Sequence, residues 1–562
     1  MIKIVITVLL LASCFCISSA QHTNNSVEEV YVMTNKSIYE TSEDLWFKAF
    51  VFDGTKMKLS ANNSQTLYLV IKNPNDSVVW AEKYPLNSGM GNGQVYIGDT
   101  WVSGEYIISG YTRSSIGKND TTTLFPQRIT VVNELRDVPK IVKKSMRNDV
   151  SYVQVKDSFP KYSDELLNIC ISIDSAEFHP RAEIPLTISV KDTSGNPVKA
   201  NLSISVSDAL YHNPYICDDI ITSLYERRQL MKKYSDLNDC DTFLPDGVKG
   251  KEVIGSKRKA KKVAEIGEQW LNVFSDGGTP IFVSTASNGD FEIEPSVLQE
   301  MARFFFIKPV SGNELKPDIR LEHPFDSIAL YTGDRRKVVF TPPHKDSCAD
   351  SINDIYLGRG TIHLSEVEVD AKVRYPKRDK LMGYLDSISS LTGGAWVCGC
   401  EAGNSGTFLN DYEVGYTHHP AWINDYQPKE HTKPVKGQTY EMIKYLPGGD
   451  SGRGYVADIK YITWKGDEYS EEELLRMNGL WKASGYYKSP QFHVPDEEDT
   501  MSSLADIRNT LLWLPDAATN SSGVFETDIQ SSDICSRFVI DVIATDRNGR
   551  IGTSKYSFDI QR

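Results

Sequence analysis

Alternation of apolar and polar side chains organises the first hundred residues after the N-terminal segment. From Leu45 to Phe52 every second residue is apolar, and several of the intervening positions are aromatic. A period of two residues is typical of a β-strand that turns one face toward a core. Residues 66–86, TLYLVIKNPNDSVVWAEKYPL, contain two such runs around a Pro-Asn-Asp turn and predict a hairpin. Together with the later strand GEYIISGYT, the pattern predicts a β-sandwich over residues 27–135.

The same pattern returns in three later stretches. Residues 140–212 hold two alternating strands around the turn Asp192–Pro197, which predicts a second sandwich. Residues 265–332 hold a glycine turn that leads into a strand, SNGDFEIEP, and the apolar run RFFFIKPVSG, which we expect to be a buried strand of a third sandwich. Residues 455–562 alternate strands with glycine turns and predict a fourth. We therefore expect a mainly β chain of tandem immunoglobulin-like β-sandwich domains.

Two stretches break the alternation. Residues 213–264 have a helical period, with Ile221, Leu224 and Leu230 on one side, followed by the basic run GSKRKAKKVAE. We interpret them as a helical and basic linker that is solvated. The alternative is a cleavage-sensitive or polyanion-binding segment. Residues 333–454 are rich in loops around one alternating strand, TIHLSEVEVDAKVR, and predict a smaller α+β region.

The N-terminus is typical of an export signal. Lys3 supplies a positive charge, residues 4–12 form a short apolar core, and a small-residue cleavage site ends at Ala20. We favour cleavage after Ala20, so that residues 1–20 are a signal peptide. The alternative is a bacterial lipoprotein box that places a lipid anchor on Cys14. No later stretch is long and apolar enough to predict a membrane-spanning segment.

Charge and cysteine content narrow the class of protein. The formal net charge is −14, and an acidic chain repels phosphate, so we expect no nucleic-acid partner. The chain has nine cysteines, and cleavage after Ala20 would leave seven, beginning at Cys170. An odd number cannot be paired completely within one chain. Export permits disulfides, but a chain of this size does not need them to fold.

The stretch TNKSIYETSEDLWFKAFVF resembles the start of a macroglobulin-type MG2 domain. Ser42 stands where that family usually has glycine. The resemblance implies a tight turn that reverses the chain into a strand, with aromatic side chains in the sandwich core. The positions that carry the resemblance are Asn35, Lys36, Tyr39, Glu43, Phe47, Lys48 and Ala49.

Two further stretches extend the resemblance to the alpha-2-macroglobulin family. PRAEIPLTISVKDTSGNPVKANLSISVSDA is similar to the domain that follows MG2, which implies an MG3-like sandwich over 140–212. The tail is similar to a macroglobulin segment with a Trp-x-Pro element and a closing glycine, which implies a macroglobulin-like sandwich over 455–562. Its matching positions are Trp513, Pro515, Gly523, Asp533 and Gly549.

Two shorter runs resemble exported bacterial proteins that carry MG2-like domains around a TonB-receptor-plug-like segment. These runs are HLSEVEVDAK and EEELLRMNGLWKASGYYKSPQFHVPD. The resemblance implies that residues 333–454 are plug-like. The stretch lacks the usual glycine-rich plug core and no barrel follows it, which argues against transport by this chain alone.

Candidate chemistry is sparse. The family's thioester motif is Cys-Gly-Glu-Gln, and here Cys398 has Glu401 where the glutamine amide should stand, so we expect no thioester. Cysteine and histidine residues that could bind zinc follow, but their spacing does not fit a common zinc site; they are Cys398, Cys400, His418, His419 and His431. We predict no catalytic residues, no cofactor site and no metal site.

These observations predict a non-catalytic exported protein of the bacterial cell envelope, in the periplasm or at the outer-membrane surface. We expect it to bind other proteins through its tandem sandwiches, as an accessory to an outer-membrane transport or envelope system. The alternative is an uptake component whose vestigial plug-like segment docks an outer-membrane β-barrel; an enzyme and a protease trap are further alternatives. Four aromatic residues could form a binding patch, although core packing is favoured for them: Trp464, Trp481, Tyr486 and Tyr487.

Overall fold

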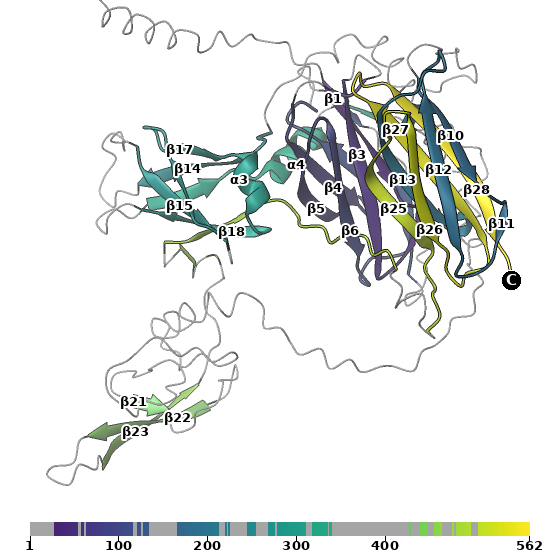
Figure 1. Ribbon diagram of the computed structural model, residues 1–562. Coiled ribbons are helices and arrows are strands. Elements are labelled where there is room, and N and C mark those ends of the chain that lie inside the picture. The colour runs from purple at the N-terminus through teal and green to yellow at the C-terminus, as the bar shows by residue number, and fades with distance from the viewer. Residues whose placement is uncertain are drawn as a thin grey trace, which may run out of the picture.

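A computed structural model places most strands of this chain in three β-sandwiches (Figure 1). The described residues are 27–53, 58–60, 63–115, 121–124, 127–133, 166–212, 220–221, 223–224, 244–254, 268–275, 278–310, 317–334, 336–339, 426–428, 439–446, 455–463, 472, 475–476, 479–495 and 504–562. The chain is mainly β, as the alternation predicts.

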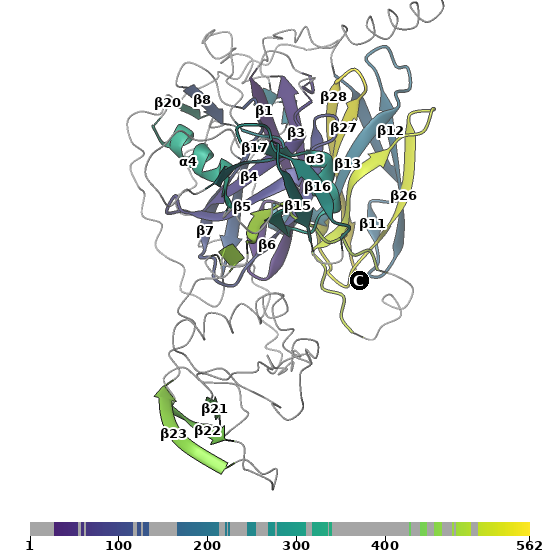
Figure 2. The ribbon, with the colours of Figure 1, turned by 90° about the vertical axis from the view of Figure 1, so that its left-hand side faces the viewer.

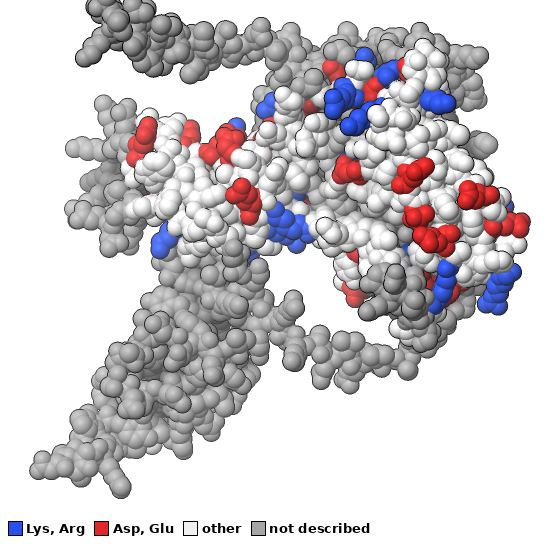
Figure 3. Space-filling model, viewed as in Figure 1, with Lys and Arg blue, Asp and Glu red and all other residues white. Residues whose placement is uncertain are grey.

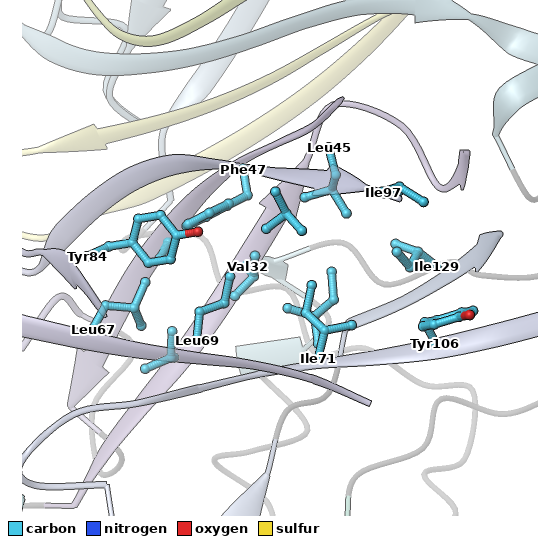
Figure 4. Packing of buried hydrophobic residues seen from close by; sticks show 14 of the residues in the cluster. Val32, Leu45, Phe47, Leu67, Leu69, Ile71, Tyr84, Ile97, Tyr106 and Ile129 are labelled. Carbon is cyan, nitrogen blue, oxygen red and sulfur yellow. The ribbon is translucent and has the colours of Figure 1, made fainter. Parts of the chain in front are cut away.

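The first sandwich pairs a three-stranded and a five-stranded sheet. The three-stranded sheet has the order β1-β3-β6, with β1 Glu28–Thr34, β3 Glu43–Asp53 and β6 Met90–Ile97. The five-stranded sheet has the order β2-β9-β7-β4-β5, with β2 Ile38–Glu40, β9 Gln127–Val132, β7 Gly104–Tyr111, β4 Thr66–Lys72 and β5 Val78–Pro85. Its core is built from the alternating residues of both sheets, such as Phe47, Leu69 and Tyr84 (Figure 4).

The expected hairpin between residues 66 and 86 is confirmed, because β4 and β5 pair antiparallel from Thr66–Pro85 to Lys72–Val78. The Asn73 side chain accepts hydrogen bonds from the Asn75 and Ser77 amides and so closes the turn.

The second sandwich is built from two distant parts of the chain, and we call it the split sandwich. One sheet has the order β10-β12-β26, with β10 Asn168–Ile173, β12 Glu183–Lys191 and β26 Val524–Gln530. The other has the order β11-β28-β27-β13-β25, with β11 Glu177–Phe178, β28 Ile551–Ile560, β27 Arg537–Asp546, β13 Ala200–Asp208 and β25 Thr510–Ala518. A short 3-10 helix, η1 Ala209–Tyr211, follows β13.

The split sandwich corrects the expectation of separate sandwiches over 140–212 and 455–562. Strand β12 pairs with β26, and β13 pairs with both β25 and β27, so the two ranges share both sheets. They also share one hydrophobic core, in which Leu202 packs with Ile540 and Phe558. Alternation shows which face of each strand is buried, but it does not show which strand lies beside it. The four strands β10 to β13 therefore depend on the C-terminal strands to close their core.

The third sandwich is smaller. Its sheets have the orders β17-β14-β19 and β16-β15-β18-β24. A short helix, α3 Pro295–Glu300, contributes Leu298 to the core between them. The strands are β14 Val248–Ile254, β15 Trp270–Phe274, β16 Ile281–Ser284, β17 Asp290–Ile293, β18 Phe304–Pro309, β19 Pro317–Leu321 and β24 Trp481–Ser484.

Two strands of the third sandwich come from outside the predicted range 265–332. Strand β14 lies within 213–264, which we interpreted as a linker, and it is the central strand of its sheet. The inward positions of β14 are Val248, Gly250 and Glu252, so its alternation is hidden by a glycine and a charged residue. Gly250 is required there, because a Cβ would meet the Phe291 ring at 2.6 Å. Strand β24 comes from within 455–562.

The remaining elements lie between β19 and β24 in the sequence, apart from one strand. Helix α4 Pro324–Asp334 packs Phe325 against Tyr68 of the first sandwich, and β20 Arg336–Val339 pairs with β8 Thr121–Leu124. Strands β21 Tyr426–Pro428, β22 Thr439–Leu446 and β23 Tyr455–Thr463 form a separate sheet. The β22–β23 hairpin crosses the expected boundary at 454/455 and corrects it. Most of the plug-like range, including residues 363–372, lies outside the described residues. Across the part of the chain that the structure describes, no helix has the length and apolarity needed to cross a membrane.

Candidate binding surface

The MG2-like motif lies at the junction between the first sandwich and the split sandwich. Asn35 accepts hydrogen bonds from the Tyr39 hydroxyl at 2.7 Å and from the Trp46 amide at 3.0 Å, which holds the predicted turn against β3. Its carbonyl accepts hydrogen bonds from the Ser205 and Ser207 hydroxyls of β13, at 2.7 and 2.9 Å. The motif therefore fixes a turn, as expected, and also binds a second domain, which the sequence did not indicate.

Lys36 carries a buried charge at the same junction. Its side chain is 2% exposed and donates to the Glu43 carboxylate at 2.8 Å and to Asn509 at 3.0 Å. The ammonium also lies 4.4 Å from the centre of the Tyr211 ring. Burial lowers the pKa of Lys36, and the charge of Glu43 opposes that shift. Glu43, Asn509 and Tyr211 belong to three separate segments of the chain, so the contacts of Lys36 connect the first sandwich to the split sandwich.

Strand β3 is buried on both faces. Residues of one parity fill the core of the first sandwich. On the other face, Phe50 and Phe52 pack with Trp513 and Ile543 of the split sandwich. Lys48 lies on this face too and pairs with Asp516. The dense aromatic content of β3 thus reflects two cores, and this surface is closed to a partner.

A serine and a histidine meet at this junction. The Ser207 hydroxyl lies 2.7 Å from His212 Nε2, which is an arrangement of nucleophile and base. Ser207 is fully buried, however, and its hydroxyl donates to the Asn35 carbonyl. Burial also lowers the pKa of His212 to about 4. The Ser207 hydroxyl therefore takes part in the contact between two domains, while His212 beside it stays partly exposed.

The third sandwich attaches to the first through side chains of both. Tyr486 has its hydroxyl 2.8 Å from Thr66 Oγ1, and Lys83 donates to the Ser484 carbonyl at 2.5 Å. Burial lowers the pKa of Lys83 to about 8. Arg303 pairs with Glu82 beside these contacts. Figure 1 shows the third sandwich to the left of the first, on the side away from the split sandwich, and in Figure 2, seen from that side, it lies in front of the first.

Core packing is confirmed for two of the aromatic residues considered for a binding patch. Trp481 and Tyr486 are 7% and 1% exposed and belong to the core of the third sandwich. Tyr487 is partly buried against the first sandwich, where its ring lies 5.1 Å from that of Trp80. Trp464 lies outside the described residues.

Three exposed aromatic side chains lie instead together on the outer face of the sheet β16-β15-β18-β24. Trp270 is 55% exposed, Phe282 57% and Phe304 42%. The prediction of a buried strand at RFFFIKPVSG therefore holds for Phe305 and Ile307, but Phe304 points outward. Neither Trp270 nor Phe282 stood out in the sequence, because each belongs to a short strand with no motif.

The strand register arranges this outer face in rows. One row joins Phe282, Asn272 and Lys308, since Asn272 is paired with Phe282 on one side and with Lys308 on the other. The neighbouring row joins Ser284 and Trp270, and the Val310 amide donates to the Trp270 carbonyl at 2.8 Å. Paired residues on one face of a sheet have their Cβ atoms about 5 Å apart.

One half of the outer face is covered at Phe274 and Phe306, although Phe304 at its end is 42% exposed, and the other half is open. Phe274 and Phe306 are covered by Leu475 and Leu480. We call the other half the open patch and define it by Trp270, Asn272, Phe282, Lys308 and Val310. Three of its members are large apolar side chains more than half exposed, which is unusual for adjacent positions of a sheet. Among the described strands, β16 has a neighbour on one side only, so the patch reaches the edge of its sheet.

Metal and thiol chemistry find little support within the described residues. No group of three or more histidine, cysteine or acidic side chains gathers there to hold a metal ion. Cys170 and Cys535 are free and exposed. The residues considered for a thioester or a zinc site lie outside the described residues, from Cys398 to His431. On the face that Figure 3 shows, acidic and basic side chains are mixed.

No protein-family model matches the chain, and no curated protein sequence does. Among solved structures it is similar to the trypsin-activated alpha-2-macroglobulin of Escherichia coli, with 8% identity and a TM-score of 0.25 over 96% of this chain and 42% of that one. A mutant Salmonella alpha-2-macroglobulin has 7% identity and a TM-score of 0.25 over 96% and 40% of the two chains. The Escherichia coli adhesin FdeC has 10% identity and a TM-score of 0.13 over 52% and 63%.

The chain thus spans less than half the length of the macroglobulins that it matches. At these identities and TM-scores, the β-sandwich architecture rests on the strand pairing of this chain and not on its neighbours.

Proposed function

We propose that this chain is an exported, non-catalytic protein of the bacterial cell envelope that binds another protein through the open patch of its third sandwich. The observation that carries the proposal is the exposure of Trp270 and Phe282 side by side on a regular sheet. Exposed aromatic side chains on a rigid surface cost free energy in water and supply binding energy when a partner covers them.

The rest of the molecule supports a binding role rather than a catalytic one. The Ser207 hydroxyl beside His212 is buried at a domain junction and donates to the Asn35 carbonyl. The MG2-like resemblance and the predicted export signal together favour the cell envelope as the site of action. Periplasm or outer-membrane surface, and a lipid on Cys14 or cleavage after Ala20, belong to the same proposal.

A photo-reactive amino acid at position 282 tests this proposal in cells that express the full chain. We expect one discrete cross-linked product after irradiation, and we expect Trp270→Ala to remove it. The matched control places the same amino acid at Tyr96, which is 48% exposed on the first sandwich, and should give no such product. Identical products from both positions, or none from position 282, would overturn the proposal.

A further inference from the structure

We infer that the open patch recognises a protein segment in which a carboxylate stands next to an apolar side chain. This inference rests on the proposed function and adds the chemistry of the partner. The sequence analysis named none of the five residues of the patch as a candidate for binding, and it expected the run that holds Lys308 and Val310 to be a buried strand. Four of the five lie on the strands β15, β16 and β18, and Val310 follows β18 directly.

The apolar part of the patch is defined by the strand register. Trp270 and Phe282 lie on neighbouring strands two residues out of step, so their side chains are diagonal neighbours on the same face. Val310, 53% exposed, continues the apolar surface beyond Trp270. An apolar side chain placed between them would remove a large apolar area from water, at about 25 cal/mol per Å².

The polar part of the patch is one exposed lysine. Asn272 lies beside it in the same row, but its Oδ1 is buried and out of reach of a partner. Lys308 is exposed on the adjacent strand, and it makes no ion pair with any described residue. The patch thus offers one cation beside its apolar surface.

Charge complementarity selects the partner. Within a polypeptide, a carboxylate is the group that complements the exposed ammonium of Lys308. The acidic residue nearest along β15 is Glu268, which precedes the strand. A polypeptide supplies a carboxylate and an apolar side chain within a few residues. A neutral sugar would use the aromatic rings but not the charge of Lys308.

Arrays of synthetic peptides test the inference with the full chain. The array holds eight-residue peptides that each contain one adjacent pair of residues. One member of the pair is Leu, Trp or Ser, the other is Asp, Asn or Lys, and both orders are included. We expect peptides that pair Leu or Trp with Asp to bind at least tenfold better than the matched Asn peptides. We expect Lys308→Glu to reverse the preference, so that peptides with Lys bind better than peptides with Asp. We expect Trp270→Ala to weaken the binding of every peptide that the wild type binds by at least tenfold.

The control variant is Lys191→Glu, which makes the same change in net charge at an exposed site of the split sandwich. It should keep the wild-type preference, and a reversal with this variant too would show a global charge effect and overturn the inference. Equal binding of Asp and Asn peptides would also overturn it. Binding of maltohexaose or oligogalacturonate that Trp270→Ala abolishes, with no binding of any peptide, would overturn it as well. Concentration-dependent dimers that Lys308→Glu abolishes would also overturn it.

The two experiments fail separately. A discrete cross-link from position 282 together with no preference for carboxylate would leave protein binding in place and remove the partner chemistry. The absence of a cross-link would remove the proposed function itself, whatever the array shows.

Discussion

The junction around Lys36 and the open patch around Trp270 contain similar side chains, but those of the junction are buried against a second domain and those of the patch are exposed. Both combine a lysine, an asparagine and large aromatic side chains, which at the junction come from a turn and the strand β3 and on the open patch from neighbouring strands. At the junction, Lys36 and Asn35 find partners in a second sandwich, and their side chains are almost fully buried. On the open patch, Lys308 is exposed and Asn272 Oδ1 accepts no hydrogen bond.

This difference assigns a structural role to the junction and a binding role to the open patch. The residues of the MG2-like motif hold two domains together. The residues left with unused interactions belong to short strands that no motif marks. A binding protein needs a rigid scaffold whose internal contacts are satisfied and one surface whose side chains are still free to contact a partner. The junction supplies the first, and the open patch supplies the second.

Lys36→Met, which removes the buried charge of the junction, has the largest expected effect on stability. The variant leaves the Glu43 carboxylate in a largely buried site without its cation, so we expect a loss of about 3 kcal/mol of unfolding free energy. Chemical denaturation of the full chain, followed by tryptophan fluorescence, measures it. The matched control is Lys72→Met, whose partner Asp76 is 71% exposed and whose loss should cost about 0.5 kcal/mol or less. Similar losses in both variants would show that the junction is not a buried polar contact.

A smaller effect is expected inside the third sandwich. Glu252 is fully buried on β14, neither of its carboxylate oxygens has a hydrogen-bond partner, and burial raises its pKa. A raised pKa means that the folded state holds the proton more tightly than the unfolded state. Stability is therefore complete below the ordinary glutamate pKa and is lost as the pH rises through the raised value.

Glu252→Gln removes this dependence, because the amide stays neutral at every pH. We expect the variant and the wild type to unfold alike near pH 4, and the variant to be more stable by about 1 kcal/mol at pH 8. Thermal unfolding at both pH values measures the difference. Glu292→Gln, an exposed position on β17, should show no such gain at pH 8. A wild type whose stability does not fall between these pH values would contradict the account of Glu252.

The smallest expected effect sharpens the account of the motif turn. Ser42 has a φ of 68°, in the left-handed region that glycine adopts at little cost, and it stands where the family usually has glycine. We expect Ser42→Gly to stabilise the first sandwich by about 0.5 kcal/mol. Thr41→Gly is the control, since Thr41 does not have a positive φ, and it should destabilise instead. A loss of stability in Ser42→Gly would show that the serine side chain contributes more than the backbone.

Strand content, the hairpin at 66–86 and the Ser42 turn could be predicted, because each depends on residues close together in the sequence. The split sandwich could not, because pairing of β12 with β26 joins residues more than 300 positions apart and every strand shows the same alternation. Strand β14 was hidden by Gly250 and Glu252 at its inward positions. The open patch was missed for a related reason: exposure of Trp270 and Phe282 depends on which neighbouring segments cover the sheet. Leu475 and Leu480 cover only its other half.

Hydrogen–deuterium exchange of the full chain tests the contrast between closed junction and open patch most directly. The amides of β3 should exchange only through global unfolding, because both faces of the strand are buried. The amides of β16 should exchange several orders of magnitude faster, because β16 lies at a sheet edge and bears an exposed face. Protection of β16 equal to that of β3 would contradict the account.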